Sequence, residues 1–163
     1  PVGAKGLLML PYFSGERTPI HDANAKGVFF GLNLTHNRAD MFRAMIEGIA
    51  YGTRHVTDTF SELGQPPSTL FAVGGGTKNS LWTQATSDIT GINQKVREKT
   101  IGASYGNAFM AALAIGLVKK EDISVWNPIR KKITAKQNST YNYNYDIFIE
   151  LYKNTKELMS KVQ

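Results

Sequence analysis

Apolar and polar positions along the chain alternate between short apolar runs and longer segments with helical spacing. Strands are predicted at residues 7–10, 28–30 with Leu32, 69–73, 94–97 and 132–135. Helices are predicted at residues 38–63, 80–89, 104–117, 121–125 and 145–160. A polar loop rich in turn residues fills positions 14–26. Because strands alternate with helices along the chain, the pattern predicts an α/β fold.

The longest predicted helix has clear start and stop signals. Asn37 can cap its first turn, and Asp40 follows three residues later, as in a capping box. Its apolar positions recur at helical spacing and are Met41, Met45, Ile49, Val56, Phe60 and Leu63. Gly48 and Gly52 lie four residues apart, so they form a smooth face against which another backbone can pack closely. Residues 64–67 end the helix.

Two further segments carry packing signals. The helix at 104–117 is built from small residues, so we expect it to pack tightly. The tyrosine-rich stretch at 141–145 is expected to pack its rings at the entry of the last helix.

Composition narrows the class of protein. The chain of 163 residues suits one domain and contains no cysteine, which is typical of a reducing compartment and predicts a cytoplasmic location. It begins at Pro1 rather than methionine, which indicates a processed chain or a piece of a longer one. No apolar run approaches the roughly 18 residues of a membrane span. The net charge of +6 favours a solvated basic surface over nucleic-acid binding, because no aromatic residues interleave with the basic ones.

The most informative motif is the glycine turn at 74–79, Gly-Gly-Gly-Thr-Lys-Asn, between a predicted strand and a predicted helix. Such a turn lets backbone N–H groups approach a phosphate, and a helix N-terminus adds partial positive charge. Neither the dinucleotide-binding fingerprint nor the P-loop fingerprint is present. From these residues alone, a tight turn without a ligand is an equal alternative.

Several motifs in order resemble the FGGY family of carbohydrate kinases. The C-terminal signature of that family is matched by Gly27-x-Phe29-x-Gly31-Leu32, seven residues, then Asp40-Met41-x-x-Ala44-Met45-Ile46-Glu47. The family's nucleotide-contacting motif resembles Gly74-Gly75-Gly76-x-x-Asn79-x-x-Trp82-x-Gln84-x-x-Ser87-Asp88. The loop at 15–19, Gly-Glu-Arg-Thr-Pro, resembles xylulose-kinase-like members. The segment at 104–108, Ser-Tyr-Gly-Asn-Ala, departs from the family's usual Ala-Leu-Gly-Ala-Ala.

The resemblance implies an actin-like ATPase fold of the ribonuclease-H type, with ATP and Mg²⁺ bound between two lobes. Residues 1–163 would form part of the C-terminal, nucleotide-binding lobe. In the family, the sugar site and the catalytic aspartate belong to the N-terminal lobe, as does a phosphate loop of Asp-x-Gly-[Ser/Thr] type. No aspartate here is followed two residues later by glycine, so we expect that lobe to be absent from this chain and the chain to be inactive alone.

The resemblance assigns nucleotide contacts to four residues of the turn. The N–H groups of Gly74, Gly75 and Gly76 would face the phosphates, and Asn79 would reach the adenine or ribose. The alternative for Asn79 is to cap the following helix. Lys78 could pair with phosphate or remain solvated.

Nearby polar residues are given structural roles. Trp82 and Gln84 would support the turn, and Asp88 would bond to a loop rather than to a metal ion. Glu16 and Arg17 would form an ion pair that holds the lobe, with substrate contact as the alternative.

Two residue groups away from the turn complete the candidates. Glu47 would pair with Arg43 or Arg54 and link the long helix to the loop at 14–26. The histidines lack metal-ligand spacing, and a His21–Asp22 dyad has no activated nucleophile beside it.

The expected function is phosphoryl transfer to xylulose or a related ketopentose, with gluconate or another polyol as the substrate alternative. A non-catalytic, actin-like nucleotide-binding or interaction module is the alternative class. Because a partial lobe leaves apolar area uncovered, we also expect the chain to associate with itself.

Overall fold

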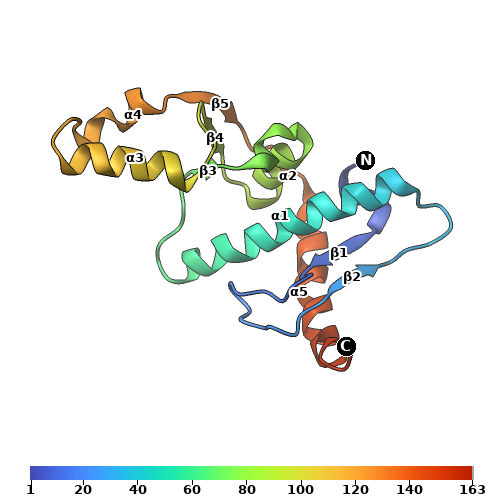
Figure 1. The fold of residues 1–163 in the computed structure, drawn as a ribbon. Coiled ribbons are helices and arrows are strands. Elements are labelled where there is room, and N and C mark those ends of the chain that lie inside the picture. The colour runs from blue at the N-terminus through green and yellow to red at the C-terminus, as the bar shows by residue number, and fades with distance from the viewer. Residues whose placement is uncertain (163) are drawn as a thin grey trace.

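The computed structural model describes residues 1–162. It is an α/β structure in which the long helix α1 (Arg38–Glu62) runs through the middle of the molecule (Figure 1). The other elements, in chain order, are η1 (Val2–Gly6), β1 (Leu8–Pro11), β2 (Gly27–Phe30), β3 (Leu70–Ala72), η2 (Gly75–Lys78), α2 (Ser80–Thr90), β4 (Gln94–Arg97), α3 (Ala103–Ala114), η3 (Lys120–Asp122), α4 (Ile123–Trp126), β5 (Ile129–Ile133) and α5 (Ser139–Met159).

The described strands form two separate small sheets. β1 pairs with β2 in antiparallel register, with Met9 opposite Phe29. β3 and β4 are parallel and are connected through α2, as a parallel pair requires. β5 adds to β4 in antiparallel register. Gln94 and Val96 of β4 are buried, and Gln94 bonds to α2, so α2 covers one face of this sheet.

The predicted start of α1 is confirmed. The Asn37 side chain accepts hydrogen bonds from the backbone N–H groups of Ala39 and Asp40, at 2.8 and 3.2 Å. In return, the Asp40 carboxylate accepts from the Asn37 N–H at 3.0 Å, which completes the capping box. The same carboxylate lies 2.9 Å from the Lys5 ammonium, so the cap also holds η1 against the helix.

The smooth face predicted at Gly48 is also confirmed. A Cβ at Gly48 would lie 2.3 Å from the Met9 carbonyl oxygen, so α1 rests directly against the backbone of β1. Gly52 is less constrained, because its nearest neighbour, Cγ of Pro11, would be 3.9 Å away. The predicted apolar stripe is only partly correct: Met41 and Met45 are half-buried, whereas Phe60 and Leu63 are exposed near the end of the helix.

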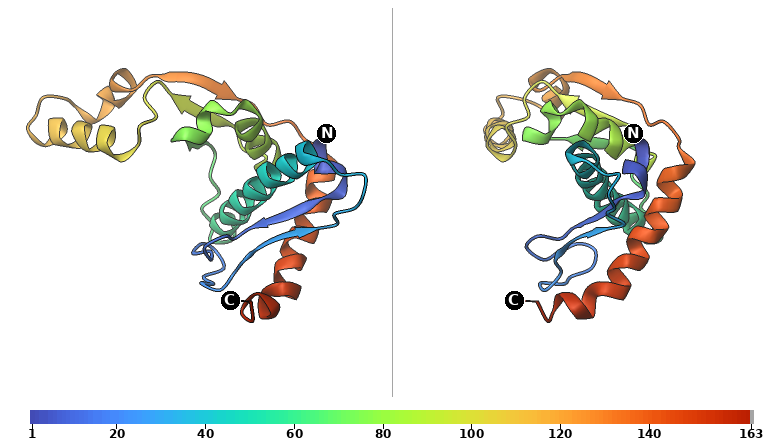
Figure 2. Two further views of the ribbon diagram at one scale, coloured as in Figure 1. Left: turned by 45° about the vertical axis from the view of Figure 1, so that its right-hand side comes forward. Right: turned by 90° about the vertical axis from the view of Figure 1, so that its right-hand side faces the viewer.

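Aromatic side chains from α1 and α5 form the main core. Tyr51 of α1 packs against Tyr141, Tyr145 and Phe148 of α5, with ring centroids 5.6–6.4 Å apart. The tyrosine-rich stretch therefore packs its rings as predicted, although Tyr143 points outward and is exposed. Figure 1 shows α5 passing behind α1 and the first sheet, and in the right-hand view of Figure 2 it runs along one side of them.

Three predicted boundaries or environments are wrong. α5 begins at Ser139 rather than at residue 145, because the Asn138 side chain caps it by accepting from the Thr140 N–H at 3.0 Å. β5 covers Ile129–Ile133 rather than residues 132–135. Tight packing of the small-residue helix is not observed: Phe109 is the buried residue of α3, and the helix lies at one end of the molecule (Figure 1).

We predict that Gly48→Ala lowers the free energy of unfolding by about 1–3 kcal/mol, because the new methyl group would overlap the Met9 carbonyl oxygen. Gly52→Ala is the matched control in the same helix and should leave stability unchanged or raise it by about 0.5–1 kcal/mol. Urea unfolding of the variants measures both effects. Equal stability of the two variants would show that the helix does not need its close approach to β1.

Candidate functional site

After β3 the chain passes through Gly74, which has a positive φ, and then forms the short 3-10 helix η2. Gly74 has φ 83° and ψ −172°, and its N–H donates to the Thr100 carbonyl at 3.0 Å. Only glycine adopts this conformation without strain. The Gly74 N–H is therefore engaged within the protein and does not face a phosphate, contrary to the prediction. The predicted order of strand, turn and helix is confirmed, with one addition: η2 (Gly75–Lys78) separates the turn from the start of α2.

Two backbone N–H groups of this turn take part in none of its hydrogen bonds. The Thr77 N–H donates to the Gly74 carbonyl and the Asn79 N–H donates to the Gly76 carbonyl, at 3.3 and 3.0 Å. Within residues 1–162, the N–H groups of Gly75 and Gly76 donate to no protein acceptor. The first N–H groups of a short helix have no partner inside it, so they are available to an anion.

The space above the turn is open. A Cβ at Gly74 or Gly75 would meet no atom within 4 Å, and Gly75, unlike Gly74, is not among the glycines with positive φ. Gly76 differs from both, because its Cβ would lie 3.3 Å from the Trp82 ring. Trp82 therefore supports the turn by packing under Gly76, as predicted. The open side and the unused donors fit a phosphate group.

Asn79 caps α2. Its Oδ1 accepts from the backbone N–H groups of Leu81 and Trp82 at 3.0 and 3.2 Å. The capping alternative is therefore correct for this oxygen. The Nδ2 group of Asn79 takes no part in the cap. The predicted contact of Asn79 with adenine or ribose would use this group, and it stays a prediction.

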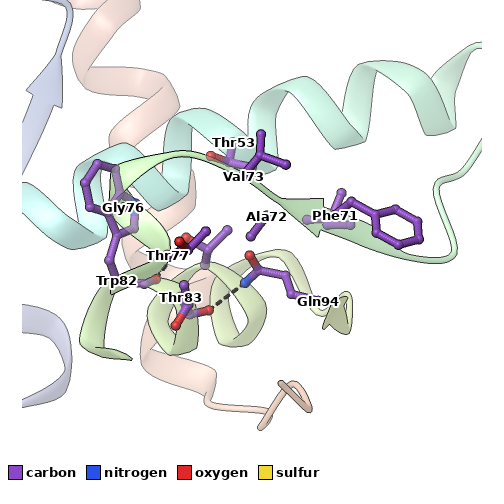
Figure 3. A pocket seen from close by; sticks show the side chains of 11 residues that line it. Thr53, Phe71, Ala72, Val73, Gly76, Thr77, Trp82, Thr83 and Gln94 are labelled. Carbon is purple, nitrogen blue, oxygen red and sulfur yellow. Dashed lines mark hydrogen bonds between the residues drawn. The ribbon is translucent and has the colours of Figure 1, made fainter. Parts of the chain in front are cut away.

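An apolar cavity of about 270 Å³ lies beside the turn (Figure 3). Trp82 flanks Gly76 on one side of it, and Gln94 lies near Thr83, to whose carbonyl it donates at 2.5 Å. Phe71 of β3 and Thr53 of α1 also line the cavity. Gly76 lines the cavity and Gly75 does not, so apolar surface lies next to one of the two residues with an unused N–H group.

Asp88 and Gln84, two polar residues of α2, have structural roles. Asp88 Oδ1 accepts from the Lys136 N–H at 2.8 Å, which confirms the predicted bond to a loop. The Gln84 amide donates to Asp88 and to the Thr134 carbonyl, at 2.7 and 3.0 Å. Gln84 thus fastens the chain after β5 and does not support the glycine turn, contrary to the prediction, because it lies on the side of α2 that faces that segment.

The predicted Glu16–Arg17 ion pair is absent among residues 1–162. The Glu16 carboxylate instead accepts from the backbone N–H groups of Arg17 and Thr18, at 2.7 and 3.1 Å. The Glu16 carboxylate therefore stabilises a local turn of the loop, because an acidic side chain can hydrogen-bond the backbone N–H groups of the residues that follow it. The Arg17 side chain is left to solvent.

Glu47 is buried and pairs with Arg43 at 2.6 Å, one of its two predicted partners. It also accepts from the Gly3 N–H at 3.0 Å, so it links α1 to η1 and not to the loop at 14–26 as predicted. Arg43 in turn donates to the Tyr141 hydroxyl at 2.6 Å. Burial, together with the nearby Glu47 carboxylate, raises the pKa of Tyr141 to about 12.

No group of three or more acidic or histidine side chains among the described residues could hold a metal ion. No helix described here is long and apolar enough to cross a membrane.

A strand, an open glycine turn and a capped helix thus lie together beside an apolar cavity. The family model for the C-terminal domain of the FGGY family of carbohydrate kinases matches residues 1–115. The chain therefore belongs to the FGGY family of carbohydrate kinases. The predicted actin-like ATPase fold is confirmed for this partial C-terminal lobe.

The chain is similar to proteins about three times its length. The xylulose kinase of Staphylococcus epidermidis is 34% identical over 161 residues, which cover 96% of this chain and 32% of that protein. A ligand-bound xylulose kinase from Lactobacillus acidophilus superposes with a TM-score of 0.87 at 28% identity, over 99% of this chain and 34% of that one. A gluconate kinase from the same organism gives 0.78 at 28% identity, over 98% and 32%.

We predict that Asn79→Ala lowers the free energy of unfolding by about 1 kcal/mol, because two N–H groups of α2 lose their cap. Asn79→Ser keeps a capping oxygen and should retain most of that stability. Thermal and urea unfolding of both variants measure the difference. If Asn79→Ala is as stable as the parent chain, the cap contributes nothing.

Proposed function

We propose that this chain is the nucleotide-binding part of an ATP-dependent sugar kinase. The complete protein would transfer the γ-phosphoryl group of ATP to a hydroxyl of xylulose or a related ketopentose. The observation that carries the proposal is the pair of N–H groups at Gly75 and Gly76 that donate to no acceptor among residues 1–162, in a turn that is open on the Cβ side of Gly75. Residues 1–163 would form part of the C-terminal lobe, and the catalytic aspartate and the sugar site would come from the lobe that is absent here.

ATP fits the residues of the turn. The N–H groups of Gly75 and Gly76 would bind phosphate oxygens, and Gly74 would hold the turn in its left-handed conformation. The Nδ2 group of Asn79 would donate to the adenine or the ribose. The neighbouring apolar cavity offers a surface to the flat, weakly polar base.

Mg²⁺ is the second expected cofactor, because phosphoryl transfer needs a cation between the phosphates. The turn offers N–H donors and no carboxylate, so it suits the phosphates and not the ion. We therefore infer that Mg²⁺ is held by the nucleotide and by residues of the absent lobe.

The choice of xylulose rests on the loop at 15–19 and on the xylulose kinases among the similar proteins. Gluconate or another polyol is the substrate alternative, since a gluconate kinase has a similar structure. The alternative class is an actin-like module that binds a nucleotide or a protein without catalysis. We place the protein in the cytoplasm, where ATP and a reducing environment suit a chain without cysteine.

Self-association is proposed for the chain on its own. Several large apolar side chains at the α3 end are more than 60% exposed, namely Ile101, Met110, Ile115, Leu117 and Val125. Exposed apolar surface of this kind drives association.

The isolated chain should bind ADP or ATP only weakly, with a Kd of about 1 mM or higher, because it has one side of the nucleotide cleft. It should transfer no phosphate to xylulose. Calorimetry and a coupled kinase assay measure the two properties. Turnover by the isolated chain at an ordinary enzymatic rate would contradict the assignment of the catalytic aspartate to another lobe.

In the complete kinase, Gly75→Val should abolish productive ATP binding while leaving sugar binding nearly intact. The branched side chain would fill the open space above the turn and displace the phosphates. The loss of two hydrogen bonds to charged oxygens is worth roughly 3–6 kcal/mol, at about 1.5–3 for each. Calorimetry with both ligands measures this effect.

The structure provides a control for folding in the same turn. Gly75→Val should stay folded, because its Cβ meets nothing within 4 Å and its φ is not positive. Gly74→Val should lower stability, because Gly74 has φ 83°. Normal ATP affinity in folded Gly75→Val would mean that the turn is only a structural connection.

A further inference from the structure

The sheet of β3, β4 and β5 has an inner face against α2 and an outer face that is open. Gln94, Val96 and Ile133 are buried on the inner face. Because side chains alternate along a strand, Lys95 of β4 projects from the outer face. Phe71, which pairs with Lys95 in the register, is 50% exposed, and its ring points away from Gln94 (Figure 3).

This outer face is strongly basic. Lys95 lies directly opposite Lys132 of β5, and like charges paired in this way across two strands are destabilising. Arg97 follows Lys95 on the same strand, and the exposed Arg130 and Lys131 extend the positive charge along β5. None of these five cations forms an ion pair with a carboxylate among residues 1–162. Positive charge that gathers without counter-charges of its own favours an anionic partner.

An aromatic ring lies within this basic surface. Nζ of Lys95 and Cζ of Arg97 are 5.8 and 5.0 Å from the centroid of the Phe71 ring. Phe71 stays half exposed with both cations in place, which leaves part of the ring for contact with another flat group. The sequence does not interleave aromatic and basic residues, and it is the pairing of β3 with β4 that brings them together.

Single-stranded nucleic acid has both features that such a surface recognises. Its phosphates suit the cations, and its unpaired bases stack on aromatic rings. An acidic peptide would satisfy the cations but has no flat group for Phe71 unless its sequence supplies one. A duplex keeps its bases stacked on one another, so its base faces are not offered to the ring.

We propose that the outer face of this sheet binds single-stranded nucleic acid. We call it the basic sheet face and define it by Phe71, Lys95, Arg97 and Lys132. The lysines would contact phosphates, and a base would stack on Phe71 beside the Arg97 guanidinium. RNA and DNA share this chemistry. The inference does not depend on the proposed kinase function, because the basic sheet face uses side chains and the glycine turn uses backbone N–H groups.

The test is a fluorescence anisotropy titration of the 163-residue chain with a labelled oligouridylate, and with an oligothymidylate of equal length in parallel. Saturable binding of either strand is expected, and it should weaken as the salt concentration rises. Phe71→Leu should weaken binding about tenfold, because one stacked base is lost. Phe30→Leu, which changes a similarly exposed phenylalanine on β2, is the matched control and should bind normally.

A pair of lysine variants tests the electrostatic part. Lys132→Gln should weaken binding and lower the slope of log Kd against log salt by about 0.7, because one phosphate contact is lost. Lys156→Gln makes the same change of charge at an exposed position of α5 and should leave the slope unchanged. All four variants alter exposed side chains, so they should remain folded, which circular dichroism verifies. If Phe71→Leu does not fold, the lysine pair decides the question.

Four results would overturn the proposal. Unchanged affinity in folded Phe71→Leu would remove the stacked base, and equal losses in Lys132→Gln and Lys156→Gln would mean diffuse attraction to a basic chain. Displacement of the oligonucleotide by MgADP would place it at the glycine turn instead. Polyglutamate binding as tightly as the oligonucleotide would make the face a site for acidic chains.

Discussion

The close contact between α1 and β1 at Gly48 is the constraint on which the arrangement depends. The Met9 carbonyl occupies the place where any other residue would carry its Cβ, so the helix and the strand meet backbone to backbone. Glu47, the preceding residue, is buried, and its carboxylate accepts hydrogen bonds from the Gly3 N–H and from Arg43. One turn of α1 thus fixes the first sheet, η1 and, through Arg43 and Tyr141, the final helix.

The same helix, α1, also positions the glycine turn, through its packing against α2. α2 packs along α1, and Asn79 joins the turn to the first residues of α2 through its cap. Trp82 then closes the underside of Gly76. The turn is therefore held from below and is open above, which is the geometry that a phosphate site needs. The turn itself contains no carboxylate, and Asp40, Glu16 and Glu47 take part in a cap, a loop closure and an ion pair elsewhere.

Much of this could be predicted from local sequence. The cap at Asn37, the smooth position at Gly48, the strand at 94–97 and the glycine turn all depend on residues close together in the chain. The start of α5 was missed because Asn138 caps a stretch of tyrosine and asparagine with low helix propensity. Side-chain partners such as Glu47 with Gly3, or Gln84 with Thr134, are 44 and 50 residues apart, and no local pattern encodes them. The exposure of α3 likewise depends on tertiary packing.

A nucleotide site at the glycine turn is tested by an NMR titration of the isotope-labelled chain with MgADP, followed at the glycine amides. We expect the signals of Gly75 and Gly76 to shift together and saturate, because their N–H groups would bind the phosphates. Gly91 and Gly116, which end α2 and α3 away from the turn, should not shift. Unchanged Gly75 and Gly76 amides, or equal shifts at all four glycines, would contradict a nucleotide site at this turn.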